Sequence, residues 1–193
     1  MPEQTLQRLL DGNQRFVENR PILDESASRR IEVAKGQHPF AIVLGCVDSR
    51  VPPELIFDQG LGELFVIRTA GEVLDRAVLG SLEFGVAELQ IPLIVVLGYK
   101  NCGAVTAAME YLHHHQKAED DIEYLVENLA LAVEIGNEVE DNRLDRAVRA
   151  QIIAVVQQLS RIPMLRAAIE QEKLKVVGAW YDIDTGAVEI ISE

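Results

Sequence analysis

The chain has 193 residues, of which 48% are hydrophobic and 25% charged, and its formal net charge is −13. These values are typical of a globular protein with a sizeable core and exclude general disorder. The negative charge argues against nucleic acid and against an anionic membrane surface as partners, because both are bound through clustered Lys and Arg. The densest apolar run, Leu93–Leu97, is far shorter than the roughly 18 residues of a membrane span, and the polar N-terminus shows no secretion signal. We therefore expect a cytoplasmic protein. No repeat or linker divides the sequence, so a single domain over residues 1–193 is expected.

The N-terminal segment is predicted to form a helical arm over residues 1–37. Two amphipathic helices are expected there, over Gln4–Glu18 and Ser26–Lys35. The first of them carries apolar side chains at near-helical spacing, namely Leu6, Leu9, Leu10, Phe16 and Val17. Both helices precede the first predicted strand.

Apolar strands then alternate with helices. Strands are predicted over Phe40–Leu44, Leu64–Ile67 and Leu93–Leu97, with a helical turn from Pro52 and a helix over about Leu74–Leu89. This alternation indicates an α/β fold, in which a central, mostly parallel sheet is flanked by helices on both faces. Ligands of such sheets bind beyond the carboxyl ends of the strands, where the strand order reverses.

The second half of the chain is predicted to be mainly helical. Helical pattern runs from Ile122 to about Glu172, and Pro163 marks a break or a new start. Leu174–Ile183 is then predicted as a strand. The sequence Asp184-Thr185-Gly186 predicts a turn into a short final strand, so the chain should end in a β-hairpin.

The two cysteines of the chain each follow a predicted strand. Cys46 comes after Phe40–Leu44, and Cys102 comes after Leu93–Leu97. Two parallel strands that end side by side would bring both thiols to one site. In a reducing cytoplasm such a pair indicates metal binding or catalysis rather than a disulfide. Two buried free thiols without a function are the alternative.

The segment Cys46-Val47-Asp48-Ser49-Arg50 places a thiol, a carboxylate and a guanidinium at alternating positions. In an extended segment this spacing sends all three side chains to one side. A thiolate and a carboxylate are suitable zinc ligands, and Arg50 can hold Asp48 in a bidentate ion pair. A strand-to-loop turn with a local Asp–Arg pair is the alternative interpretation.

An ordered series of motifs resembles the β-class carbonic anhydrases over nearly the whole chain. The series comprises Cys46-Val47-Asp48-Ser49-Arg50 with the following Val51-Pro52-Pro53-Glu54, Phe57 to Phe65, Arg68-Thr69-Ala70-Gly71, Gly80 to Phe84, Val95-Val96-Leu97-Gly98 and Cys102-Gly103-Ala104-Val105. Asn13 to Phe16 and Gly178 to Asp182 are also similar to the family. The resemblance implies the fold of that family and the reversible hydration of carbon dioxide to bicarbonate, a lyase reaction.

The resemblance also implies a zinc site and a set of site residues. Zinc would be held by Cys46, Cys102 and a histidine, and Asp48 would either bind the metal or pair with Arg50. Asp48 and Arg50 are the implied catalytic residues, with Asp48 as gatekeeper and hydrogen-bond acceptor. The resemblance further implies that the N-terminal helices pack on a second subunit, so that a homodimer or a higher oligomer forms.

The chain departs from the family pattern at the histidine position, which is Tyr99, and at the next position, which is Lys100. A phenol must lose a proton with a pKa near 10 to bind zinc, whereas neutral imidazole binds directly. Cys46, Cys102 and Asp48 would still offer three ligands, with water or Tyr99 as a fourth. Lys100 is expected to lower the pKa of the thiols and to attract an anion. We do not expect His113, His114 or His115 to replace the missing histidine ligand, because His113 would lie some 16 Å from Cys102 along the helix that begins near Gly103. We interpret this run of histidines as a solvated helix end rather than a separate metal patch.

Two hypotheses follow. The first is a zinc carbonic anhydrase with weakened or altered activity. The second is a metal-poor or metal-free homologue that retains the fold and serves in binding or regulation, because a fold alone does not guarantee its chemistry.

Overall fold

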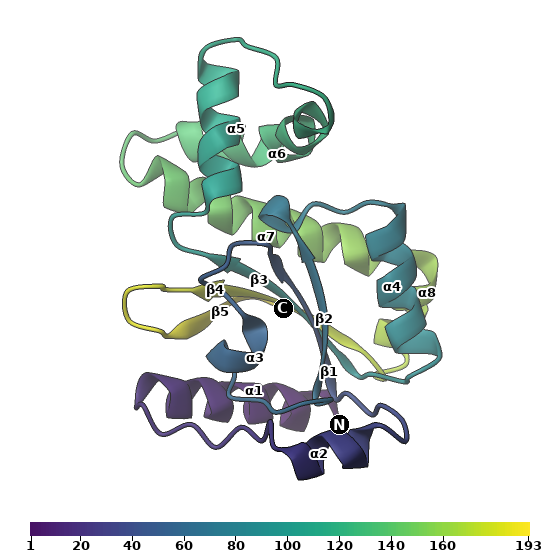
Figure 1. The fold of residues 1–193 in the computed structure, drawn as a ribbon. Coiled ribbons are helices and arrows are strands. Elements are labelled where there is room, and N and C mark those ends of the chain that lie inside the picture. Colours follow the sequence, from purple (N-terminus) through teal and green to yellow (C-terminus); the bar gives the residue numbers. More distant parts are fainter.

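The structure is a computed structural model that describes residues 1–193 (Figure 1). Its centre is a five-stranded sheet in the order β2-β1-β3-β4-β5. The strands are β1 (Ala41–Cys46), β2 (Leu64–Thr69), β3 (Leu93–Tyr99), β4 (Lys175–Tyr181) and β5 (Val188–Ser192). The first four are parallel, and β5 runs antiparallel to β4. The predicted α/β fold with a mostly parallel sheet and a C-terminal hairpin is therefore confirmed.

The middle strands carry continuous apolar sequence because helices cover both of their faces. Every residue of β1 and β3 is buried, whereas every residue of β2, which forms one edge of the sheet, is only half-buried. After β1 the chain adds β2 on one side, and it later adds β3 on the other side of β1. The strand order therefore reverses at the carboxyl ends of β1 and β3, where the two cysteines lie.

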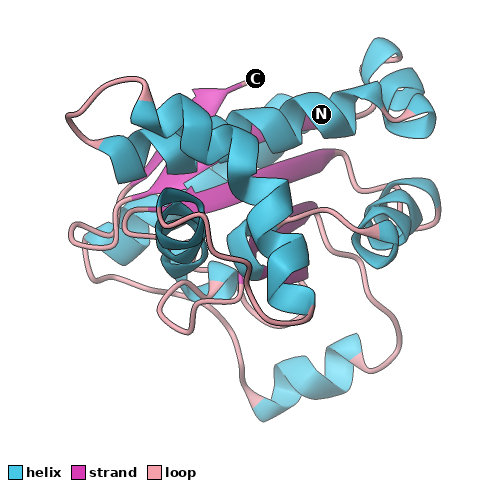
Figure 2. Ribbon diagram, turned by 90° about the horizontal axis from the view of Figure 1, so that it is seen from above, coloured by secondary structure: helices cyan, strands magenta, loops and turns pink.

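Helices form a layer on each face of the sheet (Figures 1 and 2). The helices are α1 (Pro2–Val17), α2 (Ala27–Val33), α3 (Pro53–Ile56), α4 (Arg76–Ala87), α5 (Gly103–His113), α6 (Asp121–Asn137), α7 (Arg143–Arg161) and α8 (Pro163–Glu170). On one face α7 packs on β3 and β4, with α4 and α8 beside it, and α1 lies on the other face. In Figure 1, α5 and α6 extend upward beyond the carboxyl ends of the strands. No single helix is long and apolar enough to cross a membrane, although α7 and α8 together pass that test across a bend of 85°.

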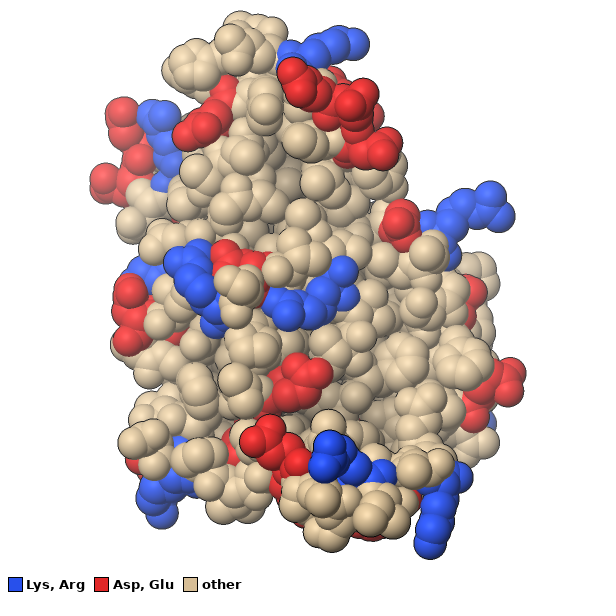
Figure 3. Space-filling view, in the orientation of Figure 1, with Lys and Arg blue, Asp and Glu red and all other residues tan.

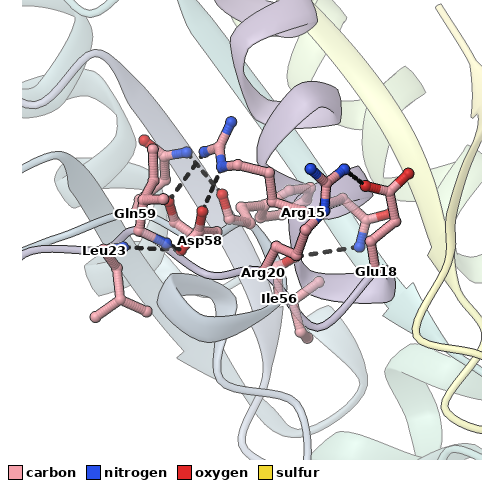
Figure 4. Close-up of polar contacts among 10 residues, drawn as sticks. Arg15, Glu18, Arg20, Leu23, Ile56, Asp58 and Gln59 are labelled. Atoms are coloured by element: carbon pink, nitrogen blue, oxygen red, sulfur yellow. Dashed lines mark hydrogen bonds and ion pairs between the residues drawn. The ribbon is translucent and has the colours of Figure 1, made fainter.

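The N-terminal arm is attached to the body through buried polar contacts. Asp58, which follows α3, accepts hydrogen bonds from the amides of Ile22 and Leu23 at 2.9 Å and pairs with Arg15 of α1 (Figure 4). Its carboxylate is fully buried. A Cβ atom at Gly12 would lie 1.9 Å from the carbonyl oxygen of Phe57, so only glycine permits this approach of α1. The arm is therefore an integral part of the fold.

The predicted helix boundaries hold except in the second half. The break at Pro163 is confirmed, since α7 ends at Arg161 and α8 begins at Pro163. A further break at residues 138–142 separates α6 from α7 and was not predicted. Asn142, with φ 56°, reverses the chain there, so that α6 and α7 pack side by side.

Candidate metal centre

The two cysteines meet where the strand order reverses. Cys46 is the last residue of β1, and Cys102 immediately precedes α5. Both side chains are buried and free of a disulfide. The thiol of Cys102, hydrogen-bonded to Cys46, lowers the pKa of Cys46, and the same contact raises the pKa of Cys102. The pair therefore behaves as one thiolate and one thiol, which confirms that the strand ends bring them together.

Asp48 is held by four hydrogen bonds. The backbone amide and Nε of Arg50 both donate to Oδ1 at 2.9 Å, and Nη2 of Arg50 donates to Oδ2 at 2.8 Å. The hydroxyl of Tyr99 also donates to Oδ2, at 2.8 Å. The bonds from Arg50 hold the pKa of Asp48 well below its usual range. Because a carboxylate has about four lone-pair sites, Asp48 is fully satisfied as an acceptor in this arrangement.

Tyr99 is a buried hydrogen-bonding residue at the end of β3, only 1% exposed. Besides donating to Asp48, its hydroxyl accepts a bond from the amide of Gly103 at 3.1 Å. Burial, and then the negative charge of the neighbouring cysteine pair, raise the pKa of Tyr99. A phenol that is both hard to ionise and engaged with a carboxylate is a poor zinc ligand. The suggestion of Tyr99 as a fourth ligand therefore finds no support in its contacts.

Lys100 does not act on the thiols as expected. Its amino group donates to Asp184 at 2.8 Å and lies 3.6 Å from Asp182, both in the hairpin turn after β4. The charge of Lys100 is thus compensated by these two carboxylates, and Lys100 is not among the groups that shift the pKa of either cysteine. The expectation that Lys100 lowers the thiol pKa was wrong, because the sequence alone could not bring the distant hairpin turn beside β3.

Arg68, near the end of β2, supports the loop that carries the predicted site residues. Its Nε donates to the carbonyl oxygen of Cys46 at 2.7 Å, and its Nη2 donates to that of Asp48 at 2.6 Å. The sequence motif that contains Arg68 did not predict this role. Its position at the end of the strand adjacent to β1 was the available signal.

The surface histidines lie apart from this centre. His113, His114 and His115 are exposed at the far end of α5. His113 and His114 face each other edge to face, with ring centroids 5.0 Å apart. Their exposure agrees with a solvated helix end.

Glu72 is a buried carboxylate that sequence reasoning missed. It follows β2 at the same edge of the sheet, is 1% exposed, and its Oε1 has no hydrogen-bond partner. Burial, and then the charge of Cys46, raise the pKa of Glu72 well above its usual value. The signal was available in the sequence: a carboxylate follows the carboxyl end of a strand that neighbours β1. Glutamate in a loop is ordinarily solvated, so the signal was easily passed over.

An apolar cavity of about 320 Å³ opens beside Cys46. It extends from the β1 loop to the helices α5 and α6, and its lining is Cys46, Val47, Asp48, Ala70, Tyr99, Gly103, Ala104, Ala107, Ala108, Ile122, Leu125 and Val126. Asp48 is the only Asp, Glu, Lys or Arg in that lining. The cavity suits a small, weakly polar molecule.

The donor set at the strand ends is compatible with zinc but incomplete. Two sulfur donors are the ligands that zinc prefers. As the chain is folded here, however, no three His, Cys, Asp or Glu side chains converge to hold a metal ion. Asp48 is paired with Arg50, which is the arrangement that the sequence predicted for it away from a metal, and it also accepts a bond from Tyr99, which was not predicted. The predicted trio of Cys46, Cys102 and Asp48 remains a prediction.

Comparisons with known proteins agree with the geometry. The carbonic anhydrase family model matches residues 41–188. Carbonic anhydrase 2 of Mycobacterium tuberculosis is 42% identical over 180 residues, which cover 92% of this chain and 87% of that protein. The carbonic anhydrase of Mycolicibacterium smegmatis is 39% identical over 186 residues, which cover 95% of this chain and 90% of that protein.

The similar solved structures are also β-carbonic anhydrases. The Coccomyxa β-carbonic anhydrase in complex with acetazolamide is similar with a TM-score of 0.74 and 26% identity, covering 96% of this chain and 86% of that one. A tetrameric β-carbonic anhydrase of Sordaria macrospora is similar with a TM-score of 0.77 and 25% identity, covering 84% and 85%. Enzymes of this type generally use zinc. From its motifs, its fold and these relatives together, the chain belongs to the β-carbonic anhydrase family.

Proposed function

We propose that this protein hydrates carbon dioxide reversibly to bicarbonate at a zinc ion held by Cys46 and Cys102, with lower activity than a site with a histidine ligand would give. The pairing of the two thiols at the reversal of strand order, beside an apolar cavity, is the observation that carries the proposal. When bound, zinc supplies Lewis acidity, which lowers the pKa of a water molecule towards neutrality.

The protein's own residues would bind and orient the reactants. The apolar walls from α5 and α6 favour carbon dioxide, which is small and uncharged, over larger or charged molecules. Asp48 is the acceptor that would orient the attacking oxygen, and Arg50 fixes its position through the bidentate pair. Arg68 is a positioning residue, because it holds the carbonyl oxygens of Cys46 and Asp48.

Tyr99 is the physical reason to expect reduced activity. Its hydroxyl takes the acceptor site on Asp48 Oδ2 that an attacking oxygen would otherwise use. It also provides no neutral nitrogen for the metal. Both effects act at the same position.

The same observation favours a second candidate function, a metal-poor homologue that binds or regulates without catalysis. If Asp48 stays satisfied by Arg50 and Tyr99, the centre is a stable hydrogen-bonded unit that needs no metal. The two candidates differ in zinc content, so one measurement separates them.

The test is the zinc content and the carbon dioxide hydration rate of the purified protein. We expect about one zinc ion per chain and measurable hydration in the native protein, and neither in Cys46→Ser or Cys102→Ser, because each substitution removes one of the two sulfur ligands of the proposed site. The matched control replaces His113, His114 and His115 by glutamine, which removes the surface histidines and should leave zinc content unchanged. A native protein free of zinc and inactive after zinc addition would favour the non-catalytic homologue.

Self-association and location are proposed on separate grounds. We infer that the chain forms a homodimer or a higher oligomer. Figure 3 shows a broad face with few charges over β2 and α4. Phe84 of α4 is 48% exposed, and the centroid of its ring is 6.5 Å from that of Phe65 of β2. Apolar surface of this kind is typical of an interface.

A cytoplasmic location is supported by the two adjacent free thiols, because an oxidising compartment would favour their conversion to a disulfide.

A further inference from the structure

The carboxylate of Glu72 has no explained role in the fold. Its side chain is 1% exposed, and Oε1 has no hydrogen-bond partner. A buried polar group without a partner costs free energy, and a buried carboxylate costs more than most. No Lys or Arg pairs with it. An unsatisfied buried group in a native structure needs an explanation, such as strain, a catalytic role or a bound ion.

The backbone holds Glu72 in an unusual conformation just after the carboxyl end of β2. Gly71 and Glu72 both have positive φ, 67° and 55°, a region that glutamate rarely adopts. The two residues lie next to the end of β1, and the amide of Gly71 lowers the pKa of Cys46 through a hydrogen bond. Gln151 fixes this turn from α7 by donating to the carbonyl oxygen of Gly71 at 3.0 Å. The turn, held by this hydrogen bond from Gln151, therefore places Glu72 next to the end of β1, where Cys46 lies.

Glu72 is close enough to both cysteines for their charges to interact. The charge of Cys46 disfavours ionisation of Glu72, and the charge of Glu72 in turn helps to raise the pKa of Cys102. Ionisation of all three groups together is therefore opposed by mutual repulsion in a buried place with no Lys or Arg among them. A divalent cation would remove this repulsion and satisfy the free oxygen at the same time.

We propose that Glu72 is the third protein ligand of the metal, in place of the absent histidine, so that this chain holds zinc through Cys46, Cys102 and Glu72. The inference rests on the proposed zinc site at the two cysteines. Carboxylate oxygen is an accepted zinc ligand beside sulfur. Because no three such side chains converge in the present fold, the Glu72 carboxylate has to rotate towards the sulfur atoms when the metal binds. Asp48 keeps its bonds to Arg50 and Tyr99 in this arrangement, whereas metal binding by Asp48 would break them.

The test measures zinc affinity by competition with a chromophoric chelator for the whole protein after removal of metal. Glu72→Gln is expected to weaken zinc binding by more than about tenfold, the least that losses around a zinc site typically cost. Glu88→Gln, at the exposed residue that follows the last residue of α4, is the matched control and should not change affinity. Glu72→Leu guards against a fold defect, because leucine needs no partner; with a thermal unfolding midpoint near the native one, it should bind zinc as weakly as Glu72→Gln.

The alternatives give different results. If Asp48→Asn weakens zinc binding more than Glu72→Gln does, Asp48 is the third ligand and the inference is overturned. If Cys46→Ser abolishes zinc binding while Glu72→Gln leaves it unchanged, the proposed function stands and the role of Glu72 falls. If the native protein binds no zinc, both are overturned. Cobalt(II) loaded in place of zinc gives a readout independent of activity, since its visible absorption should change in Glu72→Gln while the thiolate bands persist.

Discussion

Tyr99 decides how the residues around the cysteines are paired. Its hydroxyl donates to Asp48 and accepts from the amide of Gly103, so it links the β1 loop to the first turn of α5. The side chain that removes a nitrogen ligand also stabilises the rotamer of Asp48 that points away from a metal. The substitution has therefore replaced a ligand with a structural contact rather than leaving a gap.

Tyr99→His should raise zinc affinity and the rate of carbon dioxide hydration. A neutral imidazole binds zinc without losing a proton, and Asp48 Oδ2 becomes free to accept another bond. Affinity is measured by chelator competition and the rate by stopped-flow hydration. Tyr99→Phe is the matched control: it removes the phenol without adding a ligand, so affinity should not rise. Lys100→Ser should add nothing to Tyr99→His, because Lys100 is already neutralised by Asp182 and Asp184. No gain in either quantity from Tyr99→His would contradict this account.

The element that attaches the N-terminal arm is the short helix α3 with the residue after it. Asp58 is fully buried and satisfies Arg15 and the amides of Ile22 and Leu23 together. Asp58→Ala leaves these donors without an acceptor and should lower the free energy of unfolding by about 2–4 kcal/mol. Urea unfolding measures the change.

Asp11→Asn is the control for the Asp58 variant. Asp11 lies on α1 as well, but it is exposed and accepts only from Gln7, at 2.8 Å. Its replacement should change the free energy of unfolding by less than about 0.5 kcal/mol. If Asp58→Ala costs as little as the control, the arm is held mainly by apolar packing.

Sequence patterns predicted the elements well where the burial was uniform. The apolar runs of β1 and β3 predicted buried parallel strands, and the residues after them correctly predicted that Cys46 and Cys102 would meet. The break between α6 and α7 could not be predicted in the same way, because residues 138–142 lack a proline or glycine and the reversal depends on Asn142 in a left-handed conformation. Glu72 could not be recognised as buried, since its burial comes from packing between distant elements.

At the scale of the whole molecule, Lys175 connects the two ends of the chain. Its amino group lies 2.6 Å from Glu3 of α1 and 3.0 Å from Glu193. Partial burial opposes its charge, but hydrogen bonds to the two carboxylates outweigh burial and raise the pKa of Lys175 above its ordinary value near 10.5. Because the folded-state pKa is raised, this contribution to stability is complete below about pH 10.5 and is lost as the pH rises through the folded-state value.

Glu3→Gln should therefore destabilise the protein at pH 7 by less than about 1 kcal/mol, as is usual for a partly exposed pair. The difference from the native protein should shrink at a pH above the raised folded-state pKa of Lys175, where its amino group is neutral. Unfolding curves at both pH values, with the exposed Glu134→Gln as control, check this. A difference that persists unchanged at high pH would show that Glu3 acts through something other than the charge of Lys175.

The exposed apolar face over β2 predicts the assembly state. Analytical ultracentrifugation at micromolar concentration should show a dimer or a larger species. Phe84→Glu places a charge on that face and should shift the protein towards smaller species. Val139→Glu, at an equally exposed apolar residue in the turn after α6, should not. A native protein that sediments as a folded monomer would contradict the proposed interface.

The hydrogen bonds of Asn13 join the N-terminal helix to the C-terminal hairpin, so they form only after both segments have been synthesised. Its side chain donates to the carbonyl oxygen of Gly186 at 2.8 Å and accepts from the amide of Val188 at 2.9 Å, partners 173 and 175 positions further along the chain. On the ribosome, α1 emerges first, yet these partners emerge only when translation is ending. The contacts of Asn13 with the C-terminal hairpin are therefore made last, after translation has ended, whereas α1 can pack on α3 and β3 as soon as these have been made.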